Sequence, residues 1–184
     1  KNFLAKQFKE FMKFNKSFLE IGCGTGQLSN YFAIGSNNSI FALDSAFNSL
    51  VLGKKFSDAN SLKNITFIQG DLIKKNFQAD SFDFIWCNGV LHHTKNSFDA
   101  YSFCLKLLKK DGYILIGLYN SIGRIRTKFR GLLYKIFGKK YLMFFDPVLR
   151  KINTQSEKKI DAWIKDQYIH PVERSHSFDE ILSW

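Results

Sequence analysis

Apolar positions along the chain follow two spacings, and the order of these spacings predicts a layered α/β fold. Short apolar runs, typical of buried parallel strands, occur at 17–22, 39–44, 65–71, 81–91 and 113–120. Apolar residues recur at helical spacing over 3–14, 26–35, 45–60 and 97–112, and Gly112 ends the last of these ranges. Since strands that alternate with helices pair in parallel through right-handed crossovers, we expect an open parallel sheet flanked by helices.

The alternation stops after residue 120. Residues 121–168 are basic and keep helical spacing without a clear strand, and another helix begins at 176. We therefore divide the chain into three parts: a core over 1–120, a helical insertion or lid over 121–175, and the start of a C-terminal core helix over 176–184.

Segment 119–140 joins the fifth apolar run to a basic amphipathic helix. Arg and Lys side chains are interleaved with an apolar face made of Ile125, Phe129, Leu132, Leu133 and Ile136. Such a helix can pack its apolar face on the domain as a lid over the active-site mouth, which we favour. It can also lie on an anionic membrane or clamp an acidic substrate.

The composition is that of a globular protein, because 45% of the residues are hydrophobic and 23% are charged. The net charge of +11 suggests nucleic acid or anionic lipid as a partner. Lys, Asn, Phe and Ile are abundant while Pro is scarce, which is typical of coding rich in A and T. We attribute most of the charge, and the 20 Phe residues, to that bias.

Cys23, Cys87 and Cys104 are odd in number and form no CxxC pair. This argues against a disulfide framework or a thiolate zinc site and favours a reducing cytosol. No apolar stretch reaches the roughly 20 residues that span a bilayer, and no signal-peptide pattern is visible. We therefore expect a cytoplasmic protein without a transmembrane segment.

The stretch "FLEIGCGTGQLSNYF", residues 18–32, places Gly22, Gly24 and Gly26 directly after the first apolar run. Glycines let a strand turn sharply into a helix and let a ligand lie against bare backbone. The spacing is GxGxG, and Gln27 stands where the dinucleotide fingerprint GxGxxG has its last glycine. We infer a ligand-binding turn, at an edge of the sheet where ligands of open α/β folds bind.

Acidic residues stand at the ends of the first three apolar runs. Glu20 precedes the glycines, Asp44 ends the second run, and Asp71 ends the third. A carboxylate at Asp44 is well placed to accept hydrogen bonds from both hydroxyls of a ribose, or to cap the next helix. Asp71 can accept a hydrogen bond from an adenine amino group or cap the next element.

With these motifs the sequence resembles the class I S-adenosylmethionine-dependent methyltransferases. The resemblance covers residues 17 to about 120 and rests on "EIGCGTG", "FALD", "IQGD", "FDFIWCNGVLHH" and "LKKDGYILIG". It implies a Rossmann-like α/β sheet and S-adenosylmethionine as the cofactor. The family core has two further strands after strand five, which are not visible here, so we expect the chain to stop before them.

The resemblance implies a set of cofactor-binding residues: Glu20, Gly22, Cys23, Gly24, Gly26, Asp44, Asp71, Leu72 and Asn88. In this assignment the loop backbone lies against the methionyl and ribose part, and Glu20 helps to hold the methionyl amino group. Asp44 binds the ribose hydroxyls, while Asp71 and the Leu72 backbone face the adenine. Asn88 flanks the methionyl end. We interpret Cys23 as a small residue that fits there, not as a nucleophile.

His92 and His93 follow the fourth apolar run in "GVLHHT". A His at the ligand edge can act as a general base, because its reference pKa lies close to working pH. The alternative is that one ring packs structurally while the other is solvated. Either His is a candidate catalytic residue for an acceptor that arrives protonated.

The string "CNGVLHH" after the fourth run contains no Pro, unlike the Asn/Asp-Pro-Pro-aromatic motif of enzymes that methylate nucleic-acid amino groups. This argues against adenine or cytosine as the acceptor and favours a small molecule, acidic or amphipathic in character. The alternative is a module that binds RNA or anionic lipid on a degenerate methyltransferase fold. A nicotinamide dehydrogenase is disfavoured by Gln27 and Glu20.

Polar residues after the fifth run are candidates for the substrate side: Tyr119, Asn120, Arg124, His170, Glu173 and His176. The strings "GLYN…GR" and "DQYIHPVERSH" that contain them are similar to a group of bacterial methyltransferases. His170, Glu173 and His176 are spaced by three, so a helix would put them on one face, but Pro171 suggests that the helix starts there, which would leave His170 before it. Two His with a carboxylate can ligate a metal, but we favour the lining of a substrate pocket or a hydrogen-bonded structural cluster, and expect no metal.

Overall fold

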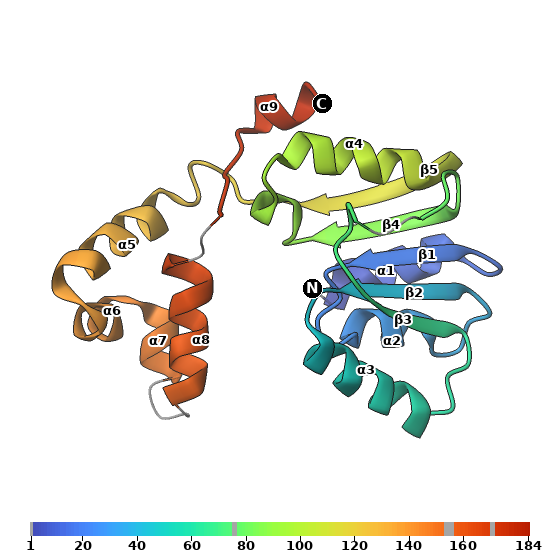
Figure 1. Ribbon diagram of the computed structural model, residues 1–184, viewed down its shortest axis with the longest axis horizontal. Coiled ribbons are helices and arrows are strands. Elements are labelled where there is room, and N and C mark those ends of the chain that lie inside the picture. The colour runs from blue at the N-terminus through green and yellow to red at the C-terminus, as the bar shows by residue number, and fades with distance from the viewer. Residues whose placement is uncertain (1, 75–76, 153–156, 170–171) are drawn as a thin grey trace. The chain divides into compact units, whose positions relative to one another are not determined.

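The computed structural model describes residues 2–74, 77–152, 157–169 and 172–184. It divides into two compact units, Lys1–Leu118 and Tyr119–Trp184 (Figure 1). The first unit contains a five-stranded sheet and the second is helical, and each is described by itself.

The sheet of the first unit is entirely parallel. Its strands are β1 (Ser17–Ile21), β2 (Ser39–Asp44), β3 (Ile65–Gln69), β4 (Phe82–Asn88) and β5 (Leu108–Gly117), in the order β3-β2-β1-β4-β5. The chain winds outward from β1 to β3 and then crosses to β4 on the other side of β1. The expected Rossmann-like α/β fold is confirmed, and its strand order reverses between β1 and β4.

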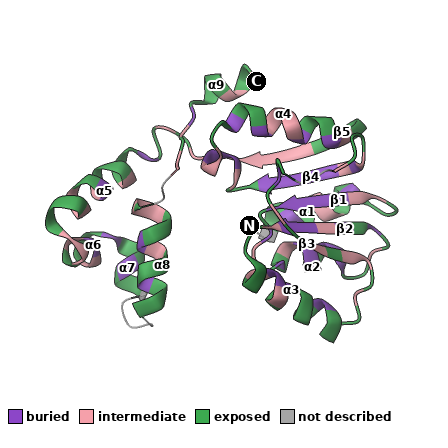
Figure 2. Ribbon diagram, in the orientation of Figure 1, coloured by how far each residue is buried: buried purple, intermediate pink, exposed green. Residues whose placement is uncertain are grey.

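Helices cover both faces of the sheet: α1 (Asn2–Met12), α2 (Gln27–Ala33), α3 (Phe47–Ala59) and α4 (Ser97–Leu107). Successive side chains of β1 point to opposite faces. Leu19 and Ile21 therefore join the core formed with α4, whereas Phe18 joins the core formed with α1 and α2. Both faces of the central strands are buried (Figure 2), as is normal for a parallel sheet.

The prediction for 97–120 was wrong at the boundary between helix and strand. The helix α4 ends at Leu107, and β5 already begins at Leu108, which pairs with Phe82. The register then shifts, because Tyr113 is the next partner, opposite Phe84. Lys109 donates to Asp83 Oδ2 at 2.8 Å and ties this irregular stretch to β4, so Gly112 lies inside the strand and does not end the helix.

The second unit contains the expected helices after strand five: α5 (Ile125–Phe137), α6 (Lys139–Phe145), α7 (Pro147–Ile152), α8 (Glu157–Tyr168) and α9 (Phe178–Leu182). Its core is small and apolar, made of Leu142, Leu149, Ile160 and Ile164. Buried Asp146 accepts hydrogen bonds from Trp163 Nε1 at 3.0 Å and Tyr168 Oη at 2.7 Å, which joins α8 to the start of α7. None of the helices in the described ranges has the length and apolar character needed to cross a bilayer.

Candidate active site

A cavity of about 730 Å³ opens at the carboxyl ends of β1 and β4, where the strand order reverses. Ligands of open α/β sheets bind at this reversal. Five of the expected cofactor residues line it: Glu20, Gly22, Cys23, Gly24 and Asn88. The described lining does not include the other four expected residues, Gly26, Asp44, Asp71 and Leu72.

Four backbone amides of the glycine loop are already hydrogen-bonded, mostly to the end of β2. The amides of Gly22 and Cys23 donate to Leu43 O at 2.8 and 3.0 Å, and Gly26 N donates to Cys23 O at 2.9 Å. Gly24 N donates to Asp44 Oδ2 at 2.7 Å. These four amides therefore already have hydrogen-bond acceptors within the chain. At these positions a ligand would contact the loop by packing against its backbone, which carries no side chain at the glycines.

The three loop glycines all have positive φ, but their surroundings differ. A Cβ at Gly22 would lie 2.3 Å from Val90 Cγ2, and one at Gly26 would lie 2.6 Å from Phe67 Cε1. At Gly24, a Cβ would meet no atom of the described residues within 4 Å. Packing requires glycine at Gly22 and Gly26, whereas Gly24 borders open space in the cavity wall.

Asp44 connects the glycine loop to the ends of two strands. Its Oδ1 accepts from Ala46 N at 2.8 Å, its Oδ2 accepts from Gly24 N, and its backbone O accepts from Gly70 N at 3.0 Å. A carboxylate has about four acceptor sites, so both oxygens can accept a further hydrogen bond. Asp71 follows Gly70, lies exposed and accepts from Ile73 N at 2.9 Å. Its neighbour Leu72 is buried.

Glu20 is a buried carboxyl on the wall of the cavity. Burial raises its pKa from 4.5 to about 7; hydrogen bonds from Ser29 oppose the rise and the charge of Asp44 adds to it. Cys23, beside it, has its pKa raised to about 12, mainly by burial and then by the charges of Glu20 and Asp44. The thiol therefore stays protonated at neutral pH, which agrees with its interpretation as a small fitting residue.

The raised pKa of Glu20 predicts a pH-dependent stability. Between pH 4.5 and about 7, the unfolded state has released the Glu20 proton while the folded state keeps it. Rising pH therefore favours unfolding, and we expect this group to lower the free energy of unfolding by about 2–3 kcal/mol over that interval. Denaturant unfolding at a series of pH values should show this loss in the wild type and not in Glu20→Gln. The exposed control Glu157→Gln should retain it, and a loss that persists in Glu20→Gln would contradict the assignment.

Several wall residues were missed by sequence reasoning. Trp86 pairs with Glu20 across β1 and β4, and Asn88 follows two residues later on the same face. This period of two in β4 was a usable signal for Trp86. Lys6 of α1 also lines the cavity, but helical spacing alone could not show that α1 reaches it.

Gly117 leaves room for Asn88, because a Cβ at Gly117 would lie 1.9 Å from Asn88 Oδ1.

The two candidate bases differ in accessibility. They lie in the short 3₁₀ turn Leu91–His93, with ring centroids 4.3 Å apart. His92 is 1% exposed, whereas His93 is half-buried. Neither belongs to the described lining of the cavity. The difference in burial favours His93 where a proton must be exchanged with an acceptor.

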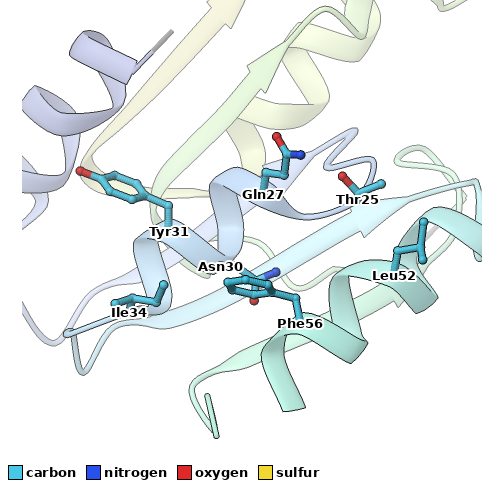
Figure 3. Close-up of a pocket in the computed structure, with 7 residues that line it drawn as sticks. All are labelled: Thr25, Gln27, Asn30, Tyr31, Ile34, Leu52 and Phe56. Carbon is cyan, nitrogen blue, oxygen red and sulfur yellow. The ribbon is translucent and has the colours of Figure 1, made fainter. Parts of the chain in front are cut away.

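A second cavity, of about 440 Å³, lies between α2 and α3 (Figure 3). Thr25, Gln27 and Tyr31 line both cavities, and Leu52 and Phe56 of α3 close the far side of this one. Its lining contains no acidic or basic side chain among the described residues. The cavity at the strand ends is therefore the better candidate for a charged ligand.

The substrate candidates of the second unit largely bind one another. Arg124 donates through Nε to Glu173 Oε1 at 3.0 Å, forms a second bond to Glu173 Oε2, and lies 4.1 Å over the Tyr119 ring. Asn120 and His176 form an isolated parallel β-bridge, in which His176 N donates to Tyr119 O at 2.9 Å and Ser121 N donates to His176 O at 2.9 Å. The Nδ1 atom of His176 lies 2.8 Å from Glu180 Oε1. These contacts favour the alternative of a hydrogen-bonded structural cluster that ties the start of the unit to its end.

Between Val172 and His176, the helix that would have placed Glu173 and His176 on one face does not form. The described part of this segment, from Val172 to Ser177, is not helical, and α9 begins only at Phe178. His170 and Pro171 lie outside the described residues. Within the described ranges, no group of three or more His, Cys, Asp or Glu side chains is placed to hold a metal ion.

Comparisons with known proteins agree with this geometry. The family described as "Methyltransferase domain" matches residues 13–165. The chain is 35% identical over 116 residues to a ubiquinone biosynthesis O-methyltransferase of Glaesserella parasuis, covering 60% of this chain and 48% of the relative. It is 27% identical to a demethylmenaquinone methyltransferase of Staphylococcus epidermidis, covering 67% of this chain and 53% of the relative. The chain thus spans about half the length of these curated relatives.

Among solved structures, the protein PKMT2 from Rickettsia typhi has a similar fold. It superposes with a TM-score of 0.73 at 18% identity, over 91% of this chain and 37% of that protein. At this level of identity, the likeness supports the fold alone.

Proposed function

Because the chain belongs to the class I S-adenosylmethionine-dependent methyltransferases, we propose that its cavity binds S-adenosylmethionine and that the protein methylates a small molecule. The observation that carries this proposal is the cavity itself. It lies at the reversal of the strand order and combines the bare surface of Gly24 with an acidic and a basic side chain, Glu20 and Lys6.

The residues of the cavity fit the amino-acid end of that cofactor. Glu20 is buried and can accept hydrogen bonds from an ammonium group, which would favour its charged form. Lys6 supplies a cation for a carboxylate, since its only described ion pair is a long one, 3.9 Å from Glu10 Oε1, and its side chain is 67% exposed. Asn88 adds an uncharged polar group to the same wall.

The nucleoside end is assigned to the neighbouring strand ends. Asp44 is held in place by two backbone amides and retains acceptor capacity for the two ribose hydroxyls. The bond from Gly70 N to Asp44 O brings the end of β3 beside it. We therefore assign the adenine side to Asp71 and the backbone of Leu72, with Gly26 shaping the turn.

When bound, S-adenosylmethionine supplies a methyl group on a positively charged sulfur. The chain's part in the reaction is to hold the acceptor in line with that methyl, because alignment supplies much of the rate of such a transfer. His93 takes the proton of an acceptor that arrives protonated, and His92 packs beside it. The roles of the polar residues after β5 remain structural in this proposal.

The acceptor class follows from the site and from the relatives. The string after β4 lacks the Pro residues of nucleic-acid amino methylation, and relatives carry names that refer to ubiquinone biosynthesis and to demethylmenaquinone. We propose an amphipathic small molecule with an oxygen, nitrogen or carbon nucleophile. The wall contributed by Leu28, Tyr31 and Trp86 offers an apolar surface for such an acceptor.

A labelled-methyl assay tests the proposal. The full chain is incubated with donor labelled in its methyl group and with metabolite extracts, and label should appear in an extractable small molecule. His93→Gln should lower transfer about 100-fold or more where a proton must be removed, with the affinity for S-adenosylhomocysteine unchanged. The proposal would be overturned in favour of a nucleic-acid-binding module if cofactor binding were undetectable and the protein bound RNA with an affinity that falls steeply as the salt concentration rises.

A further inference from the structure

The apolar side of α5 faces away from the unit that contains it. Ile125, Phe129, Leu132 and Ile136 recur every three or four residues and form one line along the helix, here called the α5 stripe. Their exposed fractions are 60%, 60%, 56% and 64%. Figure 2 shows much of α5 in the colour of exposed residues.

The opposite side of α5 makes the contacts inside the unit. Gly131 is buried, and a Cβ there would lie 3.7 Å from Tyr168 Cδ1 of α8. Thr127 and Tyr134 share the side of Gly131 and are half-buried. A surface helix normally turns its apolar side toward its own core. In α5 this arrangement is reversed, so packing within its unit does not explain the stripe.

The charged side chains of the segment that contains the stripe are all cationic, and two of them pair with acidic residues elsewhere in the unit: Arg124 with Glu173, and Lys139 with Asp161. Residues 121–145 contain seven Lys or Arg and no Asp or Glu. Arg126 and Lys135 lie on either side of the stripe and are exposed, and Lys128 beside it donates to Ser175 Oγ at 2.7 Å. A surface that is apolar along its middle and cationic along its edges matches an interface that is apolar inside and anionic outside.

We propose that the α5 stripe and its flanking cations dock on the surface of an anionic lipid bilayer, with α5 lying in the plane of the interface. The helix is about 20 Å long, enough to bury four apolar side chains at the headgroup boundary while Lys and Arg reach lipid phosphates. RNA fits less well, because three of the four stripe residues are aliphatic and cannot stack on bases. This docking goes beyond methyl transfer and does not depend on it.

Vesicle flotation of the full chain tests the docking. The protein should float with vesicles of phosphatidylglycerol and phosphatidylcholine, much less with phosphatidylcholine alone, and less as salt rises. Phe129→Asn with Ile136→Asn should lower the partition coefficient about tenfold or more. Arg126→Gln with Lys135→Gln should lower it about 25-fold, since each cation near an anionic surface contributes about fivefold.

Matched variants in the same unit serve as controls. Phe178→Asn removes an aromatic side chain that is 72% exposed on α9, and Lys158→Gln with Lys165→Gln removes two exposed cations of α8. Both should leave partitioning unchanged, and thermal melting should show that all variants fold. Equal binding to neutral vesicles, no vesicle binding, binding of RNA in place of vesicles, or equal losses in the controls would each overturn the proposal. No cofactor is present in this assay, so its result is independent of the transfer assay.

Discussion

Gly24→Ala is expected to lower the affinity for S-adenosylhomocysteine about 10- to 100-fold while leaving the fold intact. The new Cβ meets no atom of the described residues within 4 Å, so the space it enters is the space proposed for the cofactor. Overpacking by one methyl group at such a contact costs about 1–3 kcal/mol. Isothermal titration calorimetry measures the loss directly.

Gly35→Ala is the matched control for this prediction. Gly35 has φ +63°, close to the +55° of Gly24, and a Cβ there also meets nothing within 4 Å among the described residues. Each substitution therefore carries the same left-handed strain, about 1–2 kcal/mol of the free energy of unfolding. Only Gly24→Ala should weaken binding. Equal affinities in the two variants would show that the cofactor does not lie against Gly24.

Asp44→Ala is expected to weaken cofactor binding about 100-fold or more. The substitution removes the proposed acceptor of two ribose hydroxyls, and a hydrogen bond to a charged group contributes about 1.5–3 kcal/mol. It also leaves the amides of Gly24 and Ala46 without their acceptor, so the loop itself is disturbed. Calorimetry with S-adenosylhomocysteine gives the total effect of both losses.

A thermodynamic cycle separates ribose recognition from loop disturbance. A cofactor analogue without the 2′-hydroxyl should bind the wild type more weakly, and Asp44→Ala should no longer distinguish the analogue from the parent compound. Asp58→Ala, which removes the exposed partner of Lys54 in α3, should change neither affinity. If Asp44→Ala still prefers the parent compound by the full wild-type factor, the ribose assignment is wrong.

Most of the fold could be predicted because its signals are local. The apolar runs and helical spacings identified all five strands of the sheet and the helices α1 to α4. The boundary at 107–113 could not be found this way, since β5 is extended backward by the pairing of Leu108 with Phe82 and by the bond between Lys109 and Asp83. Both are contacts between segments distant in sequence, and they outweigh the helical tendency of "LKKDG".

The candidate site was predictable in position but only in part in detail. Strand ends place Glu20 and Asp44 at one edge of the sheet, whatever the details of packing. The wall formed by Lys6 was invisible, because the direction in which α1 packs depends on the whole core. The apolar face of α5 was expected to pack on the domain as a lid; that role stays a prediction, and the exposed α5 stripe motivated the membrane proposal instead.

The sequence by itself determined the order of strands and helices, the need for a bare turn after β1, and the acidic residues at the ends of the strands. These follow from backbone sterics and from the periods of strands and helices, which act over a few residues. Only the tertiary structure decided which loop amides are already engaged, that burial raises the pKa of Glu20, and that Arg124 and Glu173 bind each other. Those outcomes depend on which distant segments meet, because hydrogen-bond partners and local dielectric are properties of the assembled core.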